Sequence, residues 1–346
     1  MPGTASLKNP APPHFSRRTR RWTLVGLAIL LFCALTVMGF IYLPPTPYTP
    51  MTGLNPTHVS LIAMGDQGSG NFQQWAVAYA MEKVAEKDGR LDMVVLLGDN
   101  FYGKSLTGTA DLSWRTRFES VYWGRWLSHV PFYAVLGNHD YPDSQRVEIE
   151  YSRRHKGSGR WQMPDHTYTR DFGSDEGRPL VRMVFIDTSV PDSQLSAQIA
   201  ILEQAFMQPG PEPIWRVVAA HHPVRNVGEH NQNSLLVTEL LPVLKRLKVD
   251  LYLSGHDHNQ QLILNEGEPA WVISGGGGKT LSAISAKHSP VNFAKSEAGF
   301  AKLDFTSTQL KLAYYTESSG AAARYEWNRA CPWMAKGCLV GSMMSP

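Results

Sequence analysis

Residues 92–102 read DMVVLLGDNFY, an apolar run that leads directly into a short polar cluster. A short apolar run bounded by turn residues is typical of a buried strand. Gly98 permits a sharp turn, and Asp99 and Tyr102 follow it at once. In α/β sheets, ligands bind beyond the carboxyl ends of the strands. The segment therefore predicts a buried strand that ends at a ligand site.

The same pattern recurs along the chain. Further strands are predicted at 59–64, 131–136, 181–187, 215–220, 249–254, 270–274, 299–305 and 309–315. Helices are predicted at 71–87, 113–127, 145–155, 195–207 and 233–248. Four of the strands end, like 92–97, in groups that contain Asp66, Asn138 with His139, His221 with His222, and His256 with His258. The alternation of strands and helices indicates an α/β layered domain.

The residue types at these five strand ends suit a metal site. Carboxylate, phenol, amide and imidazole groups form a hard to borderline ligand set for iron, manganese or zinc, without thiolate. A shared carboxylate can bridge two ions about 3.5–4 Å apart, as in phosphoryl chemistry. One Gly-Asp after a strand would indicate only a turn. The ordered set of five predicts a binuclear metal centre. Six histidines without a motif are interpreted as ordinary surface or satisfied residues: His14, His58, His129, His155, His166 and His288.

The order of motifs resembles that of the purple acid phosphatases, within the calcineurin-like metallophosphoesterases. It runs Gly-Asp-x-Gly, Gly-Asp-x-x-Tyr, Gly-Asn-His-Asp, His-x-Pro and Gly-His-x-His, from about His58 to about Tyr315. The resemblance is strongest to the small, tartrate-resistant type. It implies a four-layer αββα sandwich with two mixed β-sheets. Tyr102 separates this family from the wider superfamily, which usually lacks a tyrosine ligand.

The resemblance also implies roles for individual residues. Iron(III) would be held by Asp66, Tyr102 and His258. A divalent ion (iron, zinc or manganese) would be held by Asn138, His221 and His256, and Asp99 would bridge the two ions. His139 and His230 would orient the phosphate and protonate the leaving oxygen, although His230 could also be an ordinary loop residue. His222 is not included among the ligands.

The implied function is an acid phosphatase that hydrolyses phosphate monoesters by attack of metal-bound hydroxide. One alternative is a metallophosphodiesterase acting on nucleotides. Another is a catalytically silent, membrane-anchored binding protein, although none of the seven ligand positions is missing. In mammalian members of the family a long loop after the position of Asp187 covers the site, whereas here 188–195 leads quickly into a helix, so the comparison with the family implies an open site. The segment 275–280, GGGGKT, resembles a P-loop, but Ile273 stands where that motif needs glycine, so we expect a flexible turn that lines the metal site.

An uncharged apolar run at 22–43 follows Arg17, Arg18, Arg20 and Arg21. About 20 apolar residues suffice to cross a membrane, and the preceding basic residues predict a cytoplasmic N-terminus and a periplasmic or extracytoplasmic catalytic domain. The alternative is a cleaved signal peptide. The run is longer than the usual apolar core of about 7–15 residues and lacks small residues at its end, so we favour an uncleaved anchor.

Five parts are predicted. They are a basic cytoplasmic tail (1–21), a transmembrane anchor (22–43), a Pro-rich linker (44–56), a catalytic domain (57–320) and a C-terminal tail (321–346). The formal net charge is +3, but residues 1–50 supply five basic side chains and no acidic one. The rest of the chain is therefore nearly neutral and lacks the excess of basic residues typical of a nucleic-acid binder, so no nucleic-acid partner is expected. We expect a monomer. Cys331 and Cys338 could form a disulfide in an exported domain or remain free thiols.

Overall fold

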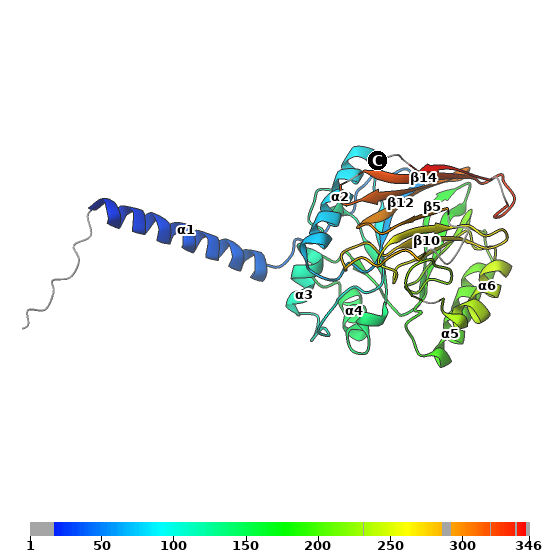
Figure 1. Ribbon diagram of the computed structural model, residues 1–346, viewed down its shortest axis with the longest axis horizontal. Coiled ribbons are helices and arrows are strands. Elements are labelled where there is room, and N and C mark those ends of the chain that lie inside the picture. The colour runs from blue at the N-terminus through cyan, green and yellow to red at the C-terminus, as the bar shows by residue number, and fades with distance from the viewer. Residues whose placement is uncertain (1–16, 231, 286–291, 319, 336–337, 344–346) are drawn as a thin grey trace, which may run out of the picture. The chain divides into compact units, whose positions relative to one another are not determined.

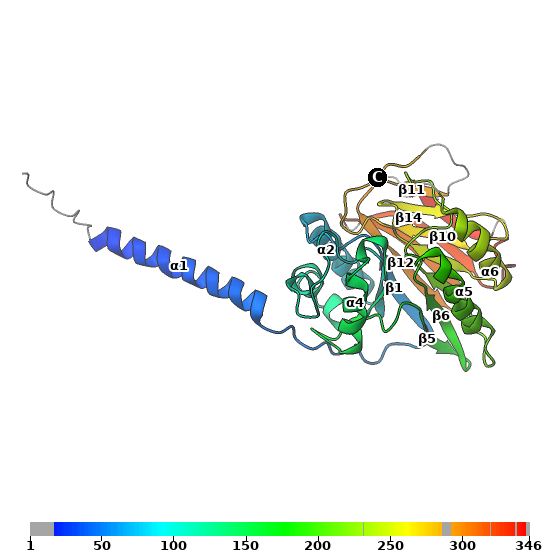
Figure 2. The same ribbon diagram turned by 90° about the horizontal axis from the view of Figure 1, so that it is seen from below.

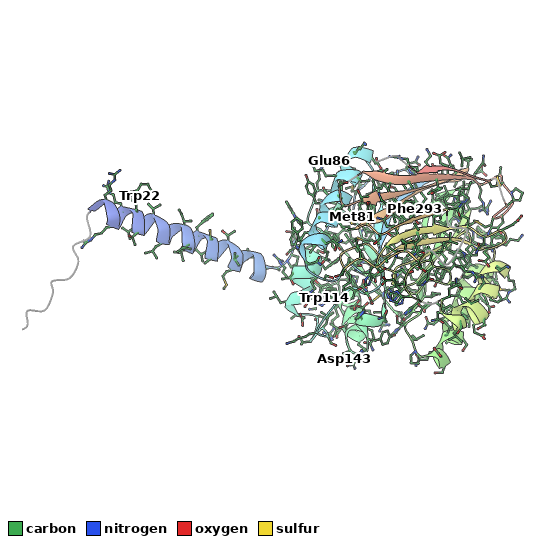
Figure 3. The ribbon with its side chains drawn as sticks, in the orientation of Figure 1. Trp22, Met81, Glu86, Trp114, Asp143 and Phe293 are labelled. Atoms are coloured by element: carbon green, nitrogen blue, oxygen red, sulfur yellow. A yellow bond between two sulfur atoms is a disulfide. The ribbon has the colours of Figure 1, made fainter. Side chains whose placement is uncertain are left out.

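The computed structural model describes residues 17–230, 232–285, 292–318, 320–335 and 338–343. The chain divides into two compact units, Met1–Pro44 and Pro45–Pro346. The first unit contains helix α1 (Arg17–Tyr42), which begins before the predicted anchor. Its segment Arg20–Gly39 is long and apolar enough to cross a membrane, a property that signal sequences share. Trp22, labelled in Figure 3, is 68% exposed on this helix.

The second unit is built on two mixed β-sheets. The first has the strand order β15-β14-β13-β12-β1-β2-β3-β4. Its strands are β1 (His58–Met64), β2 (Met93–Leu97), β3 (Phe132–Val135), β4 (Trp161–Gln162), β12 (Gly299–Thr306), β13 (Gln309–Thr316), β14 (Ala321–Asn328) and β15 (Leu339–Met343). Strands β1 to β4 run parallel, and the others are joined by antiparallel pairings.

The second sheet has the order β11-β9-β10-β8-β7-β6-β5. Its strands are β5 (Tyr168–Asp175), β6 (Arg178–Phe185), β7 (Trp215–Ala219), β8 (Leu251–Ser254), β9 (Gln260–Ile263), β10 (Ala270–Ser274) and β11 (Phe293–Lys295). Its parallel part consists of β6, β7, β8 and β10. Burial on both faces explains why the predicted strands are nearly continuous apolar runs.

Helices cover the outer face of each sheet, so the unit has four layers (Figures 1 and 2). Helices α2 (Phe72–Asp88), α3 (Leu112–Trp114) and α4 (Ser144–Arg153) lie on the side of the first sheet, and α5 (Asp192–Met207) and α6 (Leu241–Arg246) on that of the second. Along β6, Val181 and Met183 belong to the core between the sheets, whereas Val184 packs in the cluster under α5. Because successive side chains of a strand point to opposite faces of the sheet, alternate residues of β6 pack into different cores.

Two predicted helices are shorter and less regular than expected. The segment 113–127 contains α3, a π-helical turn (Arg115–Glu119) and, at its end, the start of a 3-10 turn (Leu127–His129). The segment 233–248 contains a π-helical turn (Leu236–Leu240) before α6. Trp114, labelled in Figure 3, stacks on Tyr151 with ring centroids 3.6 Å apart. In the segment 113–127, large aromatic side chains therefore pack around the short helical turns.

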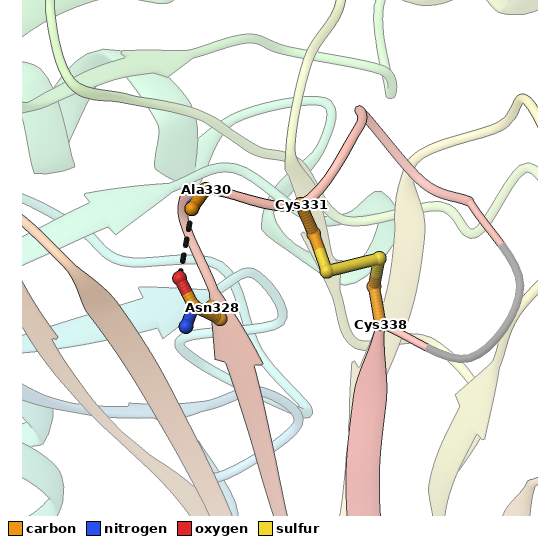
Figure 4. The surroundings of a disulfide bond; sticks show 4 residues. All are labelled: Asn328, Ala330, Cys331 and Cys338. Carbon is orange, nitrogen blue, oxygen red and sulfur yellow. Dashed lines mark hydrogen bonds between the residues drawn. A yellow bond between two sulfur atoms is a disulfide. The ribbon is translucent and has the colours of Figure 1, made fainter.

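The prediction of a separate C-terminal tail at 321–346 is wrong. Strands β14 and β15 pair with each other and extend the first sheet. A disulfide between Cys331 and Cys338 closes the connection between these two strands (Figure 4). The alternating burial of β14 fits a strand with one covered face. The second unit and its first sheet therefore continue beyond residue 320.

The predicted linker at 44–56 is held against the catalytic domain. The backbone N–H of Tyr48 donates to the carbonyl of Ser158 at 3.0 Å. The N–H of Ser174 donates to the carbonyl of Pro56 at 2.8 Å. Proline stiffens such a segment, but these two hydrogen bonds fix it as part of the second unit rather than as a free spacer.

Candidate metal centre

The motif residues follow strands whose carboxyl ends meet at one edge of the two sheets. The N–H of Gly65, just after β1, donates to the carbonyl of Ser274 at the end of β10, at 2.7 Å. Three site residues, Asp66, Asp99 and His256, have positive φ angles of 62°, 54° and 68°. Such conformations cost a non-glycine residue free energy and cluster at functional sites. The turns therefore aim side chains at the site at a cost in stability.

The first cluster gathers around the phenol of Tyr102. Its Oη lies 2.9 Å from Asp99 Oδ2, 3.2 Å from Asp66 Oδ1 and 3.2 Å from His258 Nε2. His258 Nε2 in turn lies 3.5 Å from Asp66 Oδ1. Tyr102 and both carboxylates are buried. Four donor atoms thus converge within the span that a single cation would occupy.

The second cluster gathers around Asn138. Its Oδ1 lies 3.0 Å from His221 Nε2 and 3.1 Å from His256 Nδ1, and these two ring nitrogens are 3.2 Å apart. Asp99 Oδ1 lies 3.5 Å from His221 Nε2. Asp99 therefore faces the second cluster with one carboxylate oxygen and the first cluster with the other, which is the arrangement of a bridging ligand.

Backbone groups orient the ring nitrogens toward these clusters. His221 Nδ1 lies 2.8 Å from the carbonyl of Leu97, and His258 Nδ1 lies 2.9 Å from the carbonyl of Thr280. A carbonyl accepts only from an N–H, so Nδ1 carries the proton and Nε2 presents its lone pair to a metal. The N–H of His139 donates to Asp99 Oδ1 at 2.8 Å and helps to hold that carboxylate.

The electrostatics of the clusters fit a pair of cations. Burial, together with the charges of Asp66 and Asp99, holds the pKa of Tyr102 far above its usual range. Burial also raises the pKa of Asp66. Buried acids and imidazole lone pairs that face one another are costly unless a positive charge compensates them. The donor set, without thiolate, suits hard to borderline ions such as iron, manganese and zinc.

Both residues predicted to act on the substrate lie at the rim of this centre. His139 is exposed, and its ring centroid lies 4.8 Å from that of Tyr102. His230 is exposed too; its Nδ1 lies 2.7 Å from Asp257 Oδ1, and its ring centroid 4.2 Å from that of His256. The structure therefore places His230 beside His256, as the resemblance to the small type implied, and its role toward the substrate stays a prediction.

Two further groups lie at the site: His222, which the sequence analysis named but did not include among the ligands, and Asp140, to which it gave no role. His222 lies with its ring centroid 4.5 Å from that of His256, and its Nδ1 is 3.1 Å from Thr188 Oγ1. Asp140 accepts hydrogen bonds from the N–H groups of Asn100 and Gly137, at 3.0 and 2.9 Å. Burial raises the pKa of Asp140 to about 7, and the charge of Asp99 adds to the effect. Asp140 ties together the turns that carry Asp99 and Asn138, and its place in Gly-Asn-His-Asp was the available signal.

A third group follows β6. Asp187, which is fully buried, accepts a hydrogen bond from Tyr141 Oη at 2.6 Å and lies 2.7 Å from His166 Nδ1. The hydrogen bond to Asp187 raises the pKa of His166; Asp165 acts in the same direction, and burial and Arg153 oppose it. His166 is therefore a satisfied histidine, one of the two interpretations that its sequence allowed, because it is paired with a buried carboxylate.

His166→Asn is expected to lower stability only in acid. A histidine whose pKa is raised by folding stabilises the protein fully below its unfolded pKa of about 6.5, and loses this effect as the pH rises through the folded pKa. The Tm difference between wild type and His166→Asn should be largest below about pH 6 and shrink above that range.

The matched control is His155→Asn. His155 is exposed, and its φ of 47° suits asparagine. Its Tm difference from wild type should not vary with pH. A His166→Asn difference that is the same at every pH would contradict the role assigned to Asp187.

Comparisons with known proteins agree with this geometry. Residues 57–260 match the calcineurin-like phosphoesterase family, so the chain belongs to that class. It is 31% identical over 282 residues to purple acid phosphatase 17 of Arabidopsis thaliana, covering 74% of this chain and 80% of the relative. Tartrate-resistant acid phosphatase type 5 of Oryctolagus cuniculus is 29% identical over 297 residues, 78% of this chain and 90% of that one. Within its class, the chain is a member of the purple acid phosphatases.

Solved structures share the fold. GAP50, described as the anchor in the inner membrane complex of Plasmodium, aligns with a TM-score of 0.69 and 23% identity, over 76% of this chain and 86% of that one. The purple acid phosphatase PPD1 of yellow lupin (Lupinus luteus) aligns with a TM-score of 0.60 and 17% identity, over 85% and 58% of the two chains. These likenesses confirm the predicted metallophosphoesterase sandwich.

Proposed function

We propose that this chain is a membrane-anchored, binuclear-metal acid phosphatase that hydrolyses phosphate monoesters. The observation that carries the proposal is the position of the Tyr102 phenol, within 3.2 Å of Asp66, Asp99 and His258. A phenol among two carboxylates and an imidazole is a ligand set for iron(III). Asn138, His221 and His256 would hold the divalent ion, which could be iron, zinc or manganese, and Asp99 would bridge the pair.

In this proposal, the metal centre and the histidines at its rim would have different roles in the reaction. Two bound cations would withdraw charge from the phosphate oxygens and acidify the attacking water. His139 and His230, both exposed at the rim, would bind the phosphate and deliver a proton to the leaving oxygen. Asp257 accepts from Nδ1–H of His230 and so leaves its Nε2 to face the substrate.

The location follows from helix α1. We propose that it stays in the membrane, with the N-terminus in the cytoplasm and the catalytic domain on the periplasmic or extracytoplasmic side. The basic residues before the helix and its apolar length support this arrangement. The Cys331–Cys338 disulfide supports an oxidising compartment, because such bonds are rare in the cytosol.

The test uses the full-length protein in mild detergent, supplied with iron. We expect a purple protein that hydrolyses p-nitrophenyl phosphate at acid pH and loses this activity on chelation. A colourless protein that cleaves only phosphodiesters would instead favour the diesterase alternative. If the protein shows neither a visible absorption band nor hydrolysis of phosphoesters after metal reconstitution, the result would favour the binding-protein alternative.

Tyr102→Phe is expected to abolish the purple band. The colour requires charge transfer from a phenolate to iron(III), and phenylalanine keeps the ring but removes the oxygen. The visible spectrum of the iron-loaded variant is the measurement. Tyr141→Phe, which removes a phenol bonded to Asp187 instead, is the control and should keep the band. A band that survives in Tyr102→Phe would show that another residue supplies the colour.

A further inference from the structure

The glycine run at 275–278 is packed too tightly for any side chain. A Cβ added to Gly275 would lie 2.1 Å from the carbonyl oxygen of Asp257, and one on Gly277 would lie 2.4 Å from that of Gly65. A Cβ on Gly278 would lie 2.8 Å from the carbonyl oxygen of Gln67. The run therefore passes directly against the turns that carry the site residues, and only glycine allows this approach.

This packing fixes the two residues that follow. The N–H of Lys279 donates to the carbonyl of Asp66 at 2.9 Å. The carbonyl of Thr280 orients His258 through its Nδ1 at 2.9 Å. Both backbone contacts are made to residues of the first cluster. The segment is thus a built part of the metal centre rather than a loose surface turn.

The side chain of Lys279 lies over the face of Tyr102. Its Nζ is 4.4 Å from the ring centroid, well inside the range of a cation–π interaction. Lys279 is half-buried, and it forms no salt bridge with a carboxylate in the part of the chain that the structure describes. Its charge is therefore not cancelled by a paired acid and lies close to the ring of Tyr102.

We propose that Lys279 is a positioning residue that controls the electron density on the phenol of Tyr102, and through it the charge-transfer energy of the metal centre. This inference rests on the proposed function. A positive charge beside a phenolate attracts the electron pair that the phenolate would otherwise share with iron(III). Removal of an electron from the ring costs more with Lys279 in place, so the lysine holds the visible band at shorter wavelength.

The distance favours an effect on the phenol over an effect on the metal. Lys279 lies over the ring, whereas the metal would lie beyond Oη, where Asp66, Asp99 and His258 converge. Coulomb energy falls with distance and with solvent screening, and this ring is buried. The phenolate donor is therefore stabilised more than the iron acceptor, which sets the sign of the expected shift.

The test compares the visible spectra of iron-loaded full-length variants in mild detergent. Lys279→Met removes the charge and keeps the length of the side chain. Its band should move to longer wavelength by on the order of tens of nanometres. Lys279→Gln is a second neutral variant in case the first fails to fold, and circular dichroism checks the fold of each. Lys279→Arg keeps the positive charge and its position over the ring, so its band should stay at the wild-type wavelength.

The matched control is Lys295→Met, which removes one positive charge that is paired with Glu297 at 2.9 Å. It should leave the band unchanged. A purple wild type whose band does not move in folded Lys279→Met or Lys279→Gln would overturn this inference alone. An equal shift in Lys295→Met would overturn it as well, because the effect would not be specific. A colourless wild type would overturn both the proposed function and this inference.

Discussion

Asp99→Asn should lower kcat/KM for p-nitrophenyl phosphate by about a hundredfold to a thousandfold, the scale of losing a principal electrostatic group of an active site. Asp99 faces Tyr102 with Oδ2 at 2.9 Å and His221 with Oδ1 at 3.5 Å. Asparagine keeps the shape of the side chain but has one acceptor oxygen instead of two and no charge. It therefore cannot bridge two cations.

The loss should appear as lost metal as well as lost activity. Metal content of the purified Asp99→Asn protein, determined by elemental analysis, should fall below two ions per chain. Asp175→Asn, a change at the end of β5, is the control and should keep both the metals and the activity. Wild-type hydrolysis by Asp99→Asn would sink the bridging role and with it the binuclear mechanism.

Arg160→Met should destabilise the protein by about 3–5 kcal/mol, the cost of leaving a buried charge without its partner. The side chains of Arg160 and Glu119 are 3% and 2% exposed, and Arg160 Nη2 lies 3.1 Å from Glu119 Oε2. Arg160 also donates to the carbonyls of Tyr122 and Leu127, at 2.5 and 2.7 Å. These bonds hold the irregular segment that precedes β3.

The change in the free energy of unfolding can be measured by urea denaturation, with Arg153→Met as the control. Arg153 pairs with Asp165 at 2.9 Å, but the two side chains are 57% and 56% exposed. An exposed pair of this kind is worth about 0–1 kcal/mol. The double variant Arg160→Met, Glu119→Gln should regain part of the lost stability, because it no longer buries an unpaired carboxylate. Equal effects of Arg160→Met and Arg153→Met would contradict the assignment.

Much of the fold could be predicted because parallel strands buried on both faces leave a strong local pattern. The runs at 59–64, 92–97 and 215–220 match β1, β2 and β7 within one residue at each end. Strand β5 was missed, since it contains Arg170, Asp171 and Asp175 and carries its apolar residues on one face only. Strands β14 and β15 were missed for a related reason. They lie at the end of their sheet, where β14 depends on pairing with β13, and the edge strand β15 depends on pairing with β14.

The sequence by itself determined the class of protein and the residues that we propose as metal ligands, because each of them sits in a short motif at the end of an apolar strand. Only the tertiary structure decided which other groups join them. His166 contacts Asp187, 21 positions further along the chain. Lys279 follows β10 of the second sheet and lies over Tyr102, which follows β2 of the first sheet. The first pairing continues the antiparallel register of β5 and β6, in which Tyr168 faces Phe185, within one sheet. The second pairing has no local signature, since it depends on how the two sheets pack rather than on the order of neighbouring residues. The local sequence pattern therefore predicts which residues follow a strand, and the packing of the chain decides which other residues they contact.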